Sequence, residues 1–132
     1  MNFFSHLYLD AYGVNIYICP YRRFDQLWSD LKLPEYKLNK STAGHCARTG
    51  NKIFILFNEN HLQPGIIAHE CSHATSYLFR DILECEHDNN TEEIYSYTLA
   101  WLVEKVNQTI NGELITHPED LYIIEENIDY QI

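Results

Sequence analysis

The chain has 132 residues, the size of one domain with a single hydrophobic core. Hydrophobic residues make up 45% of it and aromatic residues 14%, which is enough apolar surface to offset the entropy lost on folding and to exclude a disordered chain. Asp and Glu number 19 against 9 Lys and Arg, and a net charge of −10 repels phosphate backbones. We therefore expect a single domain over residues 1–132 and no nucleic-acid partner.

The sequence carries no basic and apolar leader, and no run of about 18 apolar residues that would suit a membrane helix. We therefore expect no membrane partner and a cytoplasmic location. Its cysteines lack CxxC spacing, so we expect reduced thiols and not disulfides at all four positions: Cys19, Cys46, Cys71 and Cys85.

The first quarter of the chain predicts strands followed by a helix. β-favouring residues alternate over residues 7–19 around Gly13, which predicts two short strands or one strand with a break. Residues 20–33 then place apolar side chains at helical spacing, and Pro34 provides a stop.

The middle of the chain predicts a hairpin or a strand, loop and strand over residues 41–58. Thr49-Gly50-Asn51 is a turn signal, and the run KIFILF that follows it strongly favours a strand. We expect this strand, residues 52–57, to form a sheet edge beside the next helix, where an extended peptide can add antiparallel to it.

Two helices are predicted in the second half. The first begins after the proline of NENHLQPG and runs to about Arg80 without a breaker, and the second spans residues 92–110, with Asn90 or Thr91 as its cap. Residues after Gly112 show no clear period. The order of elements predicts an α+β fold, in which a small mixed or antiparallel sheet packs on these two helices.

The segment GIIAHECSHATSYLF contains an HExxH motif. His69 and His73 are four residues apart, so both imidazoles project from one face of a helix and can share a tetrahedral zinc ion. Glu70 lies about 100° further around the helix, which suits a general base acting on a zinc-polarised water better than a third ligand.

The same helix is apolar over most of its circumference, so we expect it to be buried. Buried histidines need a strong partner, and this favours a metal over its absence. The alternative is an ordinary buried helix whose two histidines are satisfied by neighbouring groups. Cys71 points some 200° away from His69, which predicts packing in the core.

Glu93 lies twenty residues after His73, inside the following helix, where a third ligand is required. Glu92 is the alternative, and for one of the two glutamates the simpler explanation is an acidic first-turn residue favoured by the helix dipole. Tyr97 falls one turn after Glu93, a position from which a hydroxyl can orient a ligand histidine.

With these residues the sequence resembles the gluzincin metallopeptidases, whose thermolysin branch pairs an HExxH helix with a glutamate ligand at this distance. HECSHA and TEEIYSYTLAWLVEKV also resemble small phage or prophage proteins, over residues 54 to about 106. The resemblance implies a minimal zincin-like core that acts on a peptide or protein in the host cytoplasm. It also implies Zn²⁺ as cofactor, Glu70 as general base, and His69, His73 and Glu93 as metal ligands. Metzincins are excluded, because Ser76 and Phe79 stand where that motif needs Gly and His.

Several roles stay open. Larger gluzincins have a further subdomain that often supplies a His or Tyr to stabilise the oxyanion. Here the candidates for that role are Tyr77, Tyr95, His117 and a tyrosine of the tail after Gly112. His45-Cys46 is either a polar pair in a loop or an additional, inhibitory ligand. A competing class of function is a phage protein that keeps the zincin scaffold only to bind a host protein.

Overall fold

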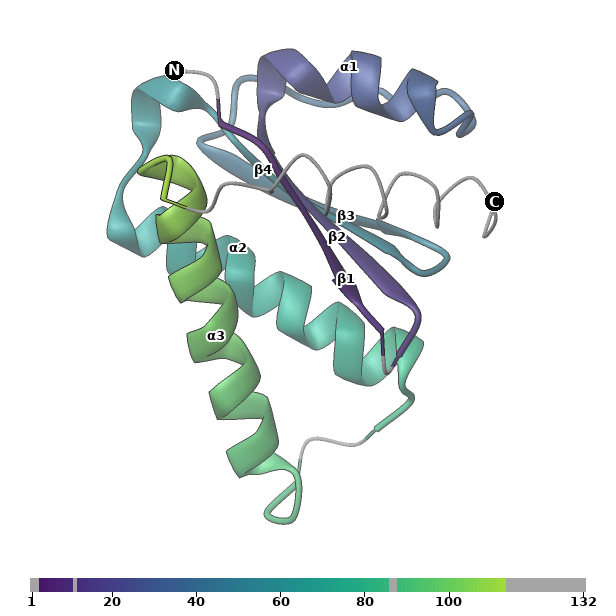
Figure 1. The fold of residues 1–132 in the computed structure, drawn as a ribbon, viewed down its shortest axis with the longest axis vertical. Helices are drawn as coiled ribbons and strands as arrows, with labels where there is room; N and C mark the ends of the chain where they lie inside the picture. The colour runs from purple at the N-terminus through teal and green to yellow at the C-terminus, as the bar shows by residue number, and fades with distance from the viewer. Residues whose placement is uncertain (1–2, 11, 86–87, 114–132) are drawn as a thin grey trace.

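The computed structural model describes residues 3–10, 12–85 and 88–113, and these form the predicted α+β fold (Figure 1). The strands are β1 (Ser5–Leu9), β2 (Val14–Pro20), β3 (Gly44–Thr49) and β4 (Lys52–Phe57). The helices are α1 (Tyr21–Asp30), α2 (Pro64–Ser76) and α3 (Glu92–Ile110), with a 3-10 turn η1 (Glu59–His61) and a π-helical segment η2 (Tyr77–Ile82). The predicted sequence of elements is confirmed. His117 and the tyrosines of the tail, which are candidates for oxyanion stabilisation, lie outside the described residues.

The four strands form one mixed sheet in the order β1-β2-β4-β3. β1 pairs with β2 and β3 pairs with β4 in antiparallel fashion, whereas the central pair β2 and β4 is parallel. The prediction that the strand Lys52–Phe57 forms a sheet edge is wrong, because β4 has a neighbour on each side and all six of its residues are buried. A continuous apolar run is what a strand covered on both faces requires. The edge beside α2 is β3.

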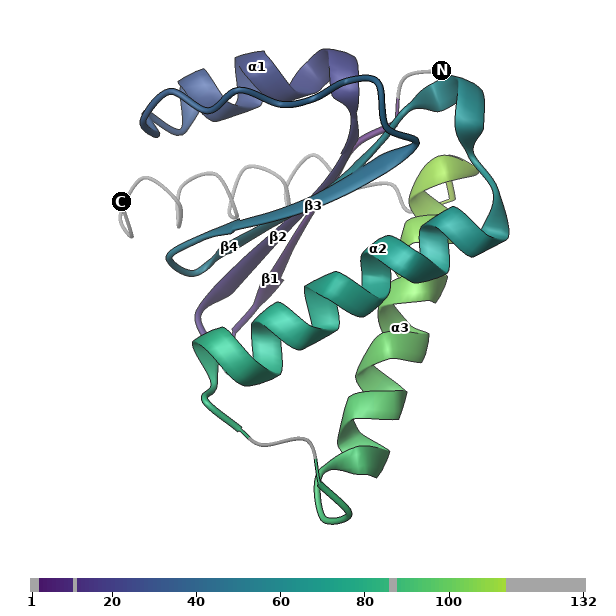
Figure 2. The same cartoon turned by 180° about the vertical axis from the view of Figure 1, so that it is seen from behind.

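Helices cover both faces of the sheet: α1 lies on one, and α2 and α3 lie on the other (Figure 2). Side chains of β4 alternate between these faces. Ile53 and Ile55 join the core that α2 and α3 close, and Phe54 and Leu56 join the core that α1 closes. Each such side chain contributes about 1.5–3 kcal/mol when fully buried, so the alternation fixes which face each helix covers.

The predicted helix through Arg80 keeps its extent but changes its winding. From Tyr77 the backbone is π-helical, and the Leu83 N–H donates to the Leu78 carbonyl at 2.8 Å, five residues back. The side chain of Asp81 in this segment lies 3.9 Å from Arg48 of β3. The segment therefore packs the end of the helix against the edge strand.

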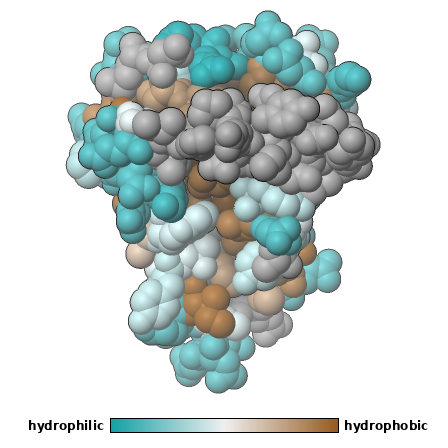
Figure 3. Space-filling view, in the orientation of Figure 1, coloured by the Kyte–Doolittle hydropathy of each residue, from teal (hydrophilic) through white to brown (hydrophobic). Residues whose placement is uncertain are grey.

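All four cysteines are free thiols, as predicted, and Cys71 is fully buried in the core. Among the described residues, no helix combines the length and the apolar character needed to cross a membrane. Figure 3 shows hydrophilic residues over α1 and at the opposite tip of this face, with apolar residues exposed between them.

Candidate metal site

One turn of α2 brings three possible metal ligands together: His69, Glu70 and His73. One donor atom from each lies within 4.8 Å of the other two, and the Nε2 atoms of His69 and His73 are 3.2 Å apart. Pro64 at the start of α2 and an absence of helix breakers up to Ser76 build this turn, and the four-residue spacing aligns the two imidazoles. The group can hold a metal ion.

The distance between the two imidazoles suits a tetrahedral metal. Two nitrogens bound at 2.0–2.1 Å to one tetrahedral zinc ion lie about 3.3 Å apart. In the structure they lie 3.2 Å apart, with the rings at 83° to each other. Without a metal the same pair forms a hydrogen bond when one Nε2 carries a proton, so the distance alone is compatible with both states.

The Glu70 side chain is only 6% exposed and lies against the edge strand. Burial raises the pKa of its carboxyl, and the nearby His69 and His73 oppose that shift. A carboxylate with a raised pKa, held beside two possible metal ligands, has the properties of a general base.

The two histidines lie on the solvent side of α2. His69, His73 and Ala68 are exposed, whereas Cys71 and Ala74 are fully buried. The prediction of buried histidines that need a partner is therefore wrong. Ala68 added to the apolar content of the helix in the sequence, yet it lies on the exposed face beside His69. The case for a metal therefore rests on the geometry of the donor atoms and not on burial of the histidines.

Glu93 is not part of the group formed by His69, Glu70 and His73. It lies exposed in the first turn of α3, as does Glu92. The inward face of α3 is set by apolar spacing and carries Leu102 and Val106, both fully buried. Glu93 is on the opposite face, and as an acidic residue at a helix start it interacts favourably with the helix dipole.

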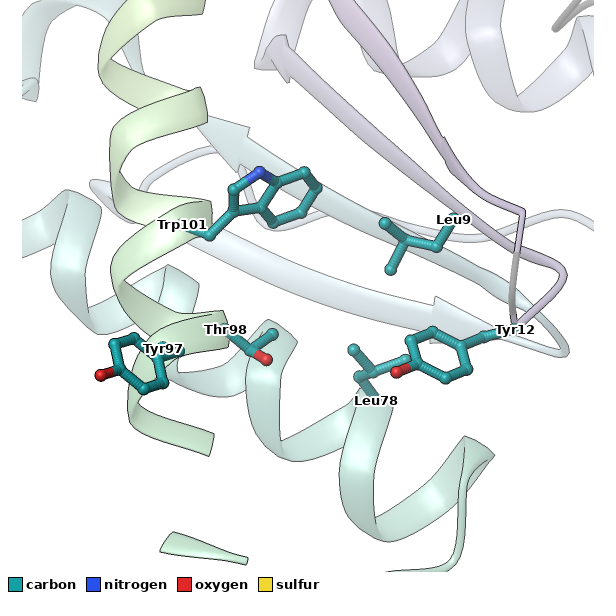
Figure 4. A pocket seen from close by; sticks show the side chains of 6 residues that line it. All are labelled: Leu9, Tyr12, Leu78, Tyr97, Thr98 and Trp101. Carbon is teal, nitrogen blue, oxygen red and sulfur yellow. The ribbon is translucent and has the colours of Figure 1, made fainter. Parts of the chain in front are cut away.

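Tyr97 is 69% exposed. It stands at the rim of an apolar pocket of about 210 Å³ between β1, α3 and η2, together with Trp101 and Leu78 (Figure 4). The tyrosine of α3 that reaches the end of α2 is Tyr95, whose hydroxyl is 2.8 Å from Ser76 Oγ. Among the described residues, no hydrogen bond joins Tyr97 to His69 or His73.

His45 and Cys46 belong to the edge strand β3 and not to a loop. His45 Nε2 is 2.9 Å from the Tyr36 hydroxyl, and burial and the charge of His73 lower the pKa of His45. Cys46 is buried, and burial followed by the charge of Glu70 raises the pKa of its thiol well above the usual range. Neither residue is a member of the His–Glu–His group.

Two neighbours of the site were missed in the sequence: Gly44 and Tyr36. An ideal Cβ placed on Gly44 would lie 2.8 Å from Cγ and 2.9 Å from Oε2 of Glu70. Tyr36 approaches through its hydrogen bond to His45. Both residues lie more than twenty positions before the motif, and only the packing of β3 on α2 brings them close, so the motif spacing offered no signal for them.

A pocket of about 420 Å³ lies at the same end of the sheet. Its wall includes Tyr21, Phe57 and Asn58, and Phe57 is the β4 residue that pairs with Gly44. Asn58 continues the pairing, since its N–H donates to the Ala43 carbonyl at 2.9 Å. The pocket therefore adjoins the strand end on which Glu70 packs.

Comparisons of this chain with protein-family models, with curated proteins and with solved structures give no match. The His–Glu–His geometry is therefore the basis for any assignment of function.

Proposed function

We propose that this protein is a zinc-dependent metallopeptidase of the zincin type, with its metal on His69 and His73 and Glu70 as general base. The observation that carries the proposal is the convergence of three possible ligands, His69, Glu70 and His73, whose donor atoms lie within 4.8 Å of one another. The 3.2 Å separation of the two Nε2 atoms is close to the value of about 3.3 Å required by one tetrahedral zinc ion. Exposed imidazoles can receive both the ion and a substrate from solvent without opening the core.

The positions of the three side chains support distinct roles. The imidazoles provide neutral nitrogen donors, which zinc prefers together with carboxylates. When bound, zinc polarises a water molecule and lowers its pKa by several units. Glu70 would accept a proton from the attacking water as its oxygen bonds to the peptide carbonyl carbon, and would give that proton to the leaving amine as the C–N bond breaks.

The position of β3 at the edge of the sheet supports the proposal that the substrate is a peptide. β3 pairs only with β4 in the described part of the chain, so its other edge is available to an extended segment. This edge begins at Gly44, against which Glu70 packs. A peptide added along β3 therefore passes beside the proposed base.

A catalytic zinc site of this type requires a third protein ligand. Glu93 stays a prediction for that role, since it lies outside the group formed by His69, Glu70 and His73. Glu93 and Glu92 occupy the first turn of α3.

Substitution of Glu70 by Gln tests the proposal. We expect Glu70→Gln to keep stoichiometric zinc and to lose hydrolysis by a factor on the order of 10²–10⁴, because the amide cannot accept the proton. Zinc content is measured by elemental analysis, and cleavage by mass spectrometry on a mixed peptide library. Glu104→Gln, an exposed change on α3, is the matched control.

An unchanged cleavage rate in Glu70→Gln would refute the role of the base. Zinc without cleavage in the natural sequence would favour the competing class, a zincin-like protein that binds a host protein. Absence of bound zinc would favour a helix whose paired histidines interact only with each other.

A further inference from the structure

We infer that Gly44 is a positioning residue for Glu70: the absence of a side chain at the first residue of the edge strand is what allows the proposed base to occupy its place. The inference rests on the proposed function. It concerns a contact between β3 and α2, and the contact can be measured whether or not the protein cleaves peptides.

Gly44 faces α2 because strand side chains alternate. Cys46, two residues further along β3, belongs to the core cluster that contains Ile67 and Cys71 of α2. Position 44 is therefore on the same side of the strand as α2, at the end where Glu70 lies.

The space at this position is already filled by the glutamate. A Cβ on Gly44 would lie 2.8 Å from Glu70 Cγ and 2.9 Å from Oε2, and 3.1 Å from Ile66 Cγ2. Carbon atoms in contact normally stay about 3.5–4.0 Å apart. An alanine would therefore displace the carboxylate by several tenths of an ångström or more, and the side chain has little free volume because it is 6% exposed.

Backbone conformation does not explain a glycine here. The glycines with positive φ are Gly13, Gly50 and Gly112, and Gly44 is not one of them. An alanine at position 44 could adopt the same backbone angles without strain. The close approach of Glu70 and Ile66 is therefore the structural reason for glycine at this position.

The consequence for the proposed reaction is geometric. A general base must lie within hydrogen-bond reach of the proton it accepts, and a misplacement of about 1 Å can reduce a rate on the order of 10²-fold. We expect Gly44→Ala to lower kcat by roughly this factor while KM and zinc content stay unchanged, since the substitution leaves His69 and His73 in place.

The experiment compares Gly44→Ala with Gly65→Ala. Gly65 lies in α2 itself, and a Cβ there would meet nothing within 4 Å, so its replacement controls for the general effect of Gly to Ala. Melting temperatures are measured for Gly44→Ala, for Glu70→Ala and for the double variant. We expect Gly44→Ala to lower the melting temperature, and the loss to shrink markedly when Glu70 is also Ala.

Three results would overturn the inference. One is a Gly44→Ala protein that cleaves as fast as the natural sequence. Another is a Gly44→Ala protein whose loss of activity equals that of Gly65→Ala. The third is an equal drop in melting temperature with and without the Glu70 side chain, which would assign the cost to Ile66 or to the backbone. If the natural protein cleaves no peptide, the proposed function fails, and the melting-temperature cycle still decides whether Gly44 makes room for Glu70.

Discussion

A buried histidine on the first strand shows how the environment of one residue sets a property of the protein. His6 is 1% exposed, and its ring stacks on Tyr17 with centroids 4.2 Å apart. Its Nε2–H donates to Asn15 Oδ1 at 2.9 Å. Burial lowers the pKa of His6 from 6.5 to about 4, the hydrogen bond to Asn15 opposes this, and the charge of Lys52 adds to it.

We predict that the protein loses stability as the pH falls from 6.5 toward 4. In this range the unfolded chain binds a proton at His6 and the folded protein does not, so acid favours unfolding. The loss from this residue is on the order of 3 kcal/mol over the whole range. Urea unfolding of the natural protein and of His6→Gln at pH 7 and pH 5 measures it, and equal pH dependence in the two proteins would contradict the prediction.

At the scale of single residues, the sequence predicted which side chains meet more successfully than it predicted which side chains are exposed. The spacing of His69 and His73 was sufficient to predict that their imidazoles meet, because helix geometry alone decides it. Their exposure was not predictable from the apolar content of the helix. The packing of Gly44 on Glu70 depends on how β3 lies across α2, a long-range contact that no local pattern encodes.

At the scale of elements, the β3–β4 hairpin is the part most directly specified by the sequence. The strands pair Thr49 with Lys52 across a two-residue turn, in which Gly50 has φ +56°. Glycine at the first turn position with positive φ is typical of type II′ hairpin turns. The turn signal at residues 49–51 therefore located the hairpin correctly.

We predict that Gly50→Ala destabilises the protein by about 1 kcal/mol. A non-glycine residue at this φ costs about 1–2 kcal/mol relative to its relaxed conformation. A Cβ at Gly50 would meet no other atom within 4 Å, so steric contact contributes nothing. Denaturant unfolding of Gly50→Ala and Gly65→Ala provides the comparison, and equal stability of the two variants would refute a backbone origin.

The order of the strands was not predictable from the elements alone. We expected KIFILF to form an edge strand, yet β4 lies between β2 and β3. The chain leaves β2 through α1 and later returns as β4, which pairs with β2 in parallel. The apolar run of β4 indicates a strand covered on both faces, and all six of its residues are buried. The apolar character of residues 52–57 therefore predicted the position of this strand in the sheet better than its closeness in sequence to the HExxH motif did.

At the scale of the whole molecule, metal binding couples to folding. We predict that zinc raises the unfolding free energy by about 3 kcal/mol when its free concentration is 100 times the dissociation constant. His73→Ala should abolish the rise, because one ligand of the pair is lost. His61→Ala, an exposed histidine outside the group, should retain it. Thermal unfolding with graded zinc and with a chelator measures each shift.

The same titration tests the predicted third ligand. Glu93→Gln should weaken zinc binding at least tenfold if its carboxylate completes the ligand set, whereas Glu104→Gln on the same helix should leave the affinity unchanged. Equal zinc affinity for Glu93→Gln and the natural protein would remove Glu93 from the site. The fold and the two histidines would be unaffected by that outcome.

A hydrogen bond between two side chains joins the first strand to α3, the last helix in the described part of the chain. Thr109 donates its hydroxyl to the Lys105 carbonyl, so the Ser5 hydroxyl is the donor in the 2.7 Å contact between Ser5 and Thr109. These residues are 104 positions apart in sequence. During synthesis on the ribosome, Ser5 therefore finds its native acceptor only after a further 104 residues have been added. A nascent chain that ends ahead of α3 leaves this face of the sheet without Leu102 and Val106, which cover it in the folded protein.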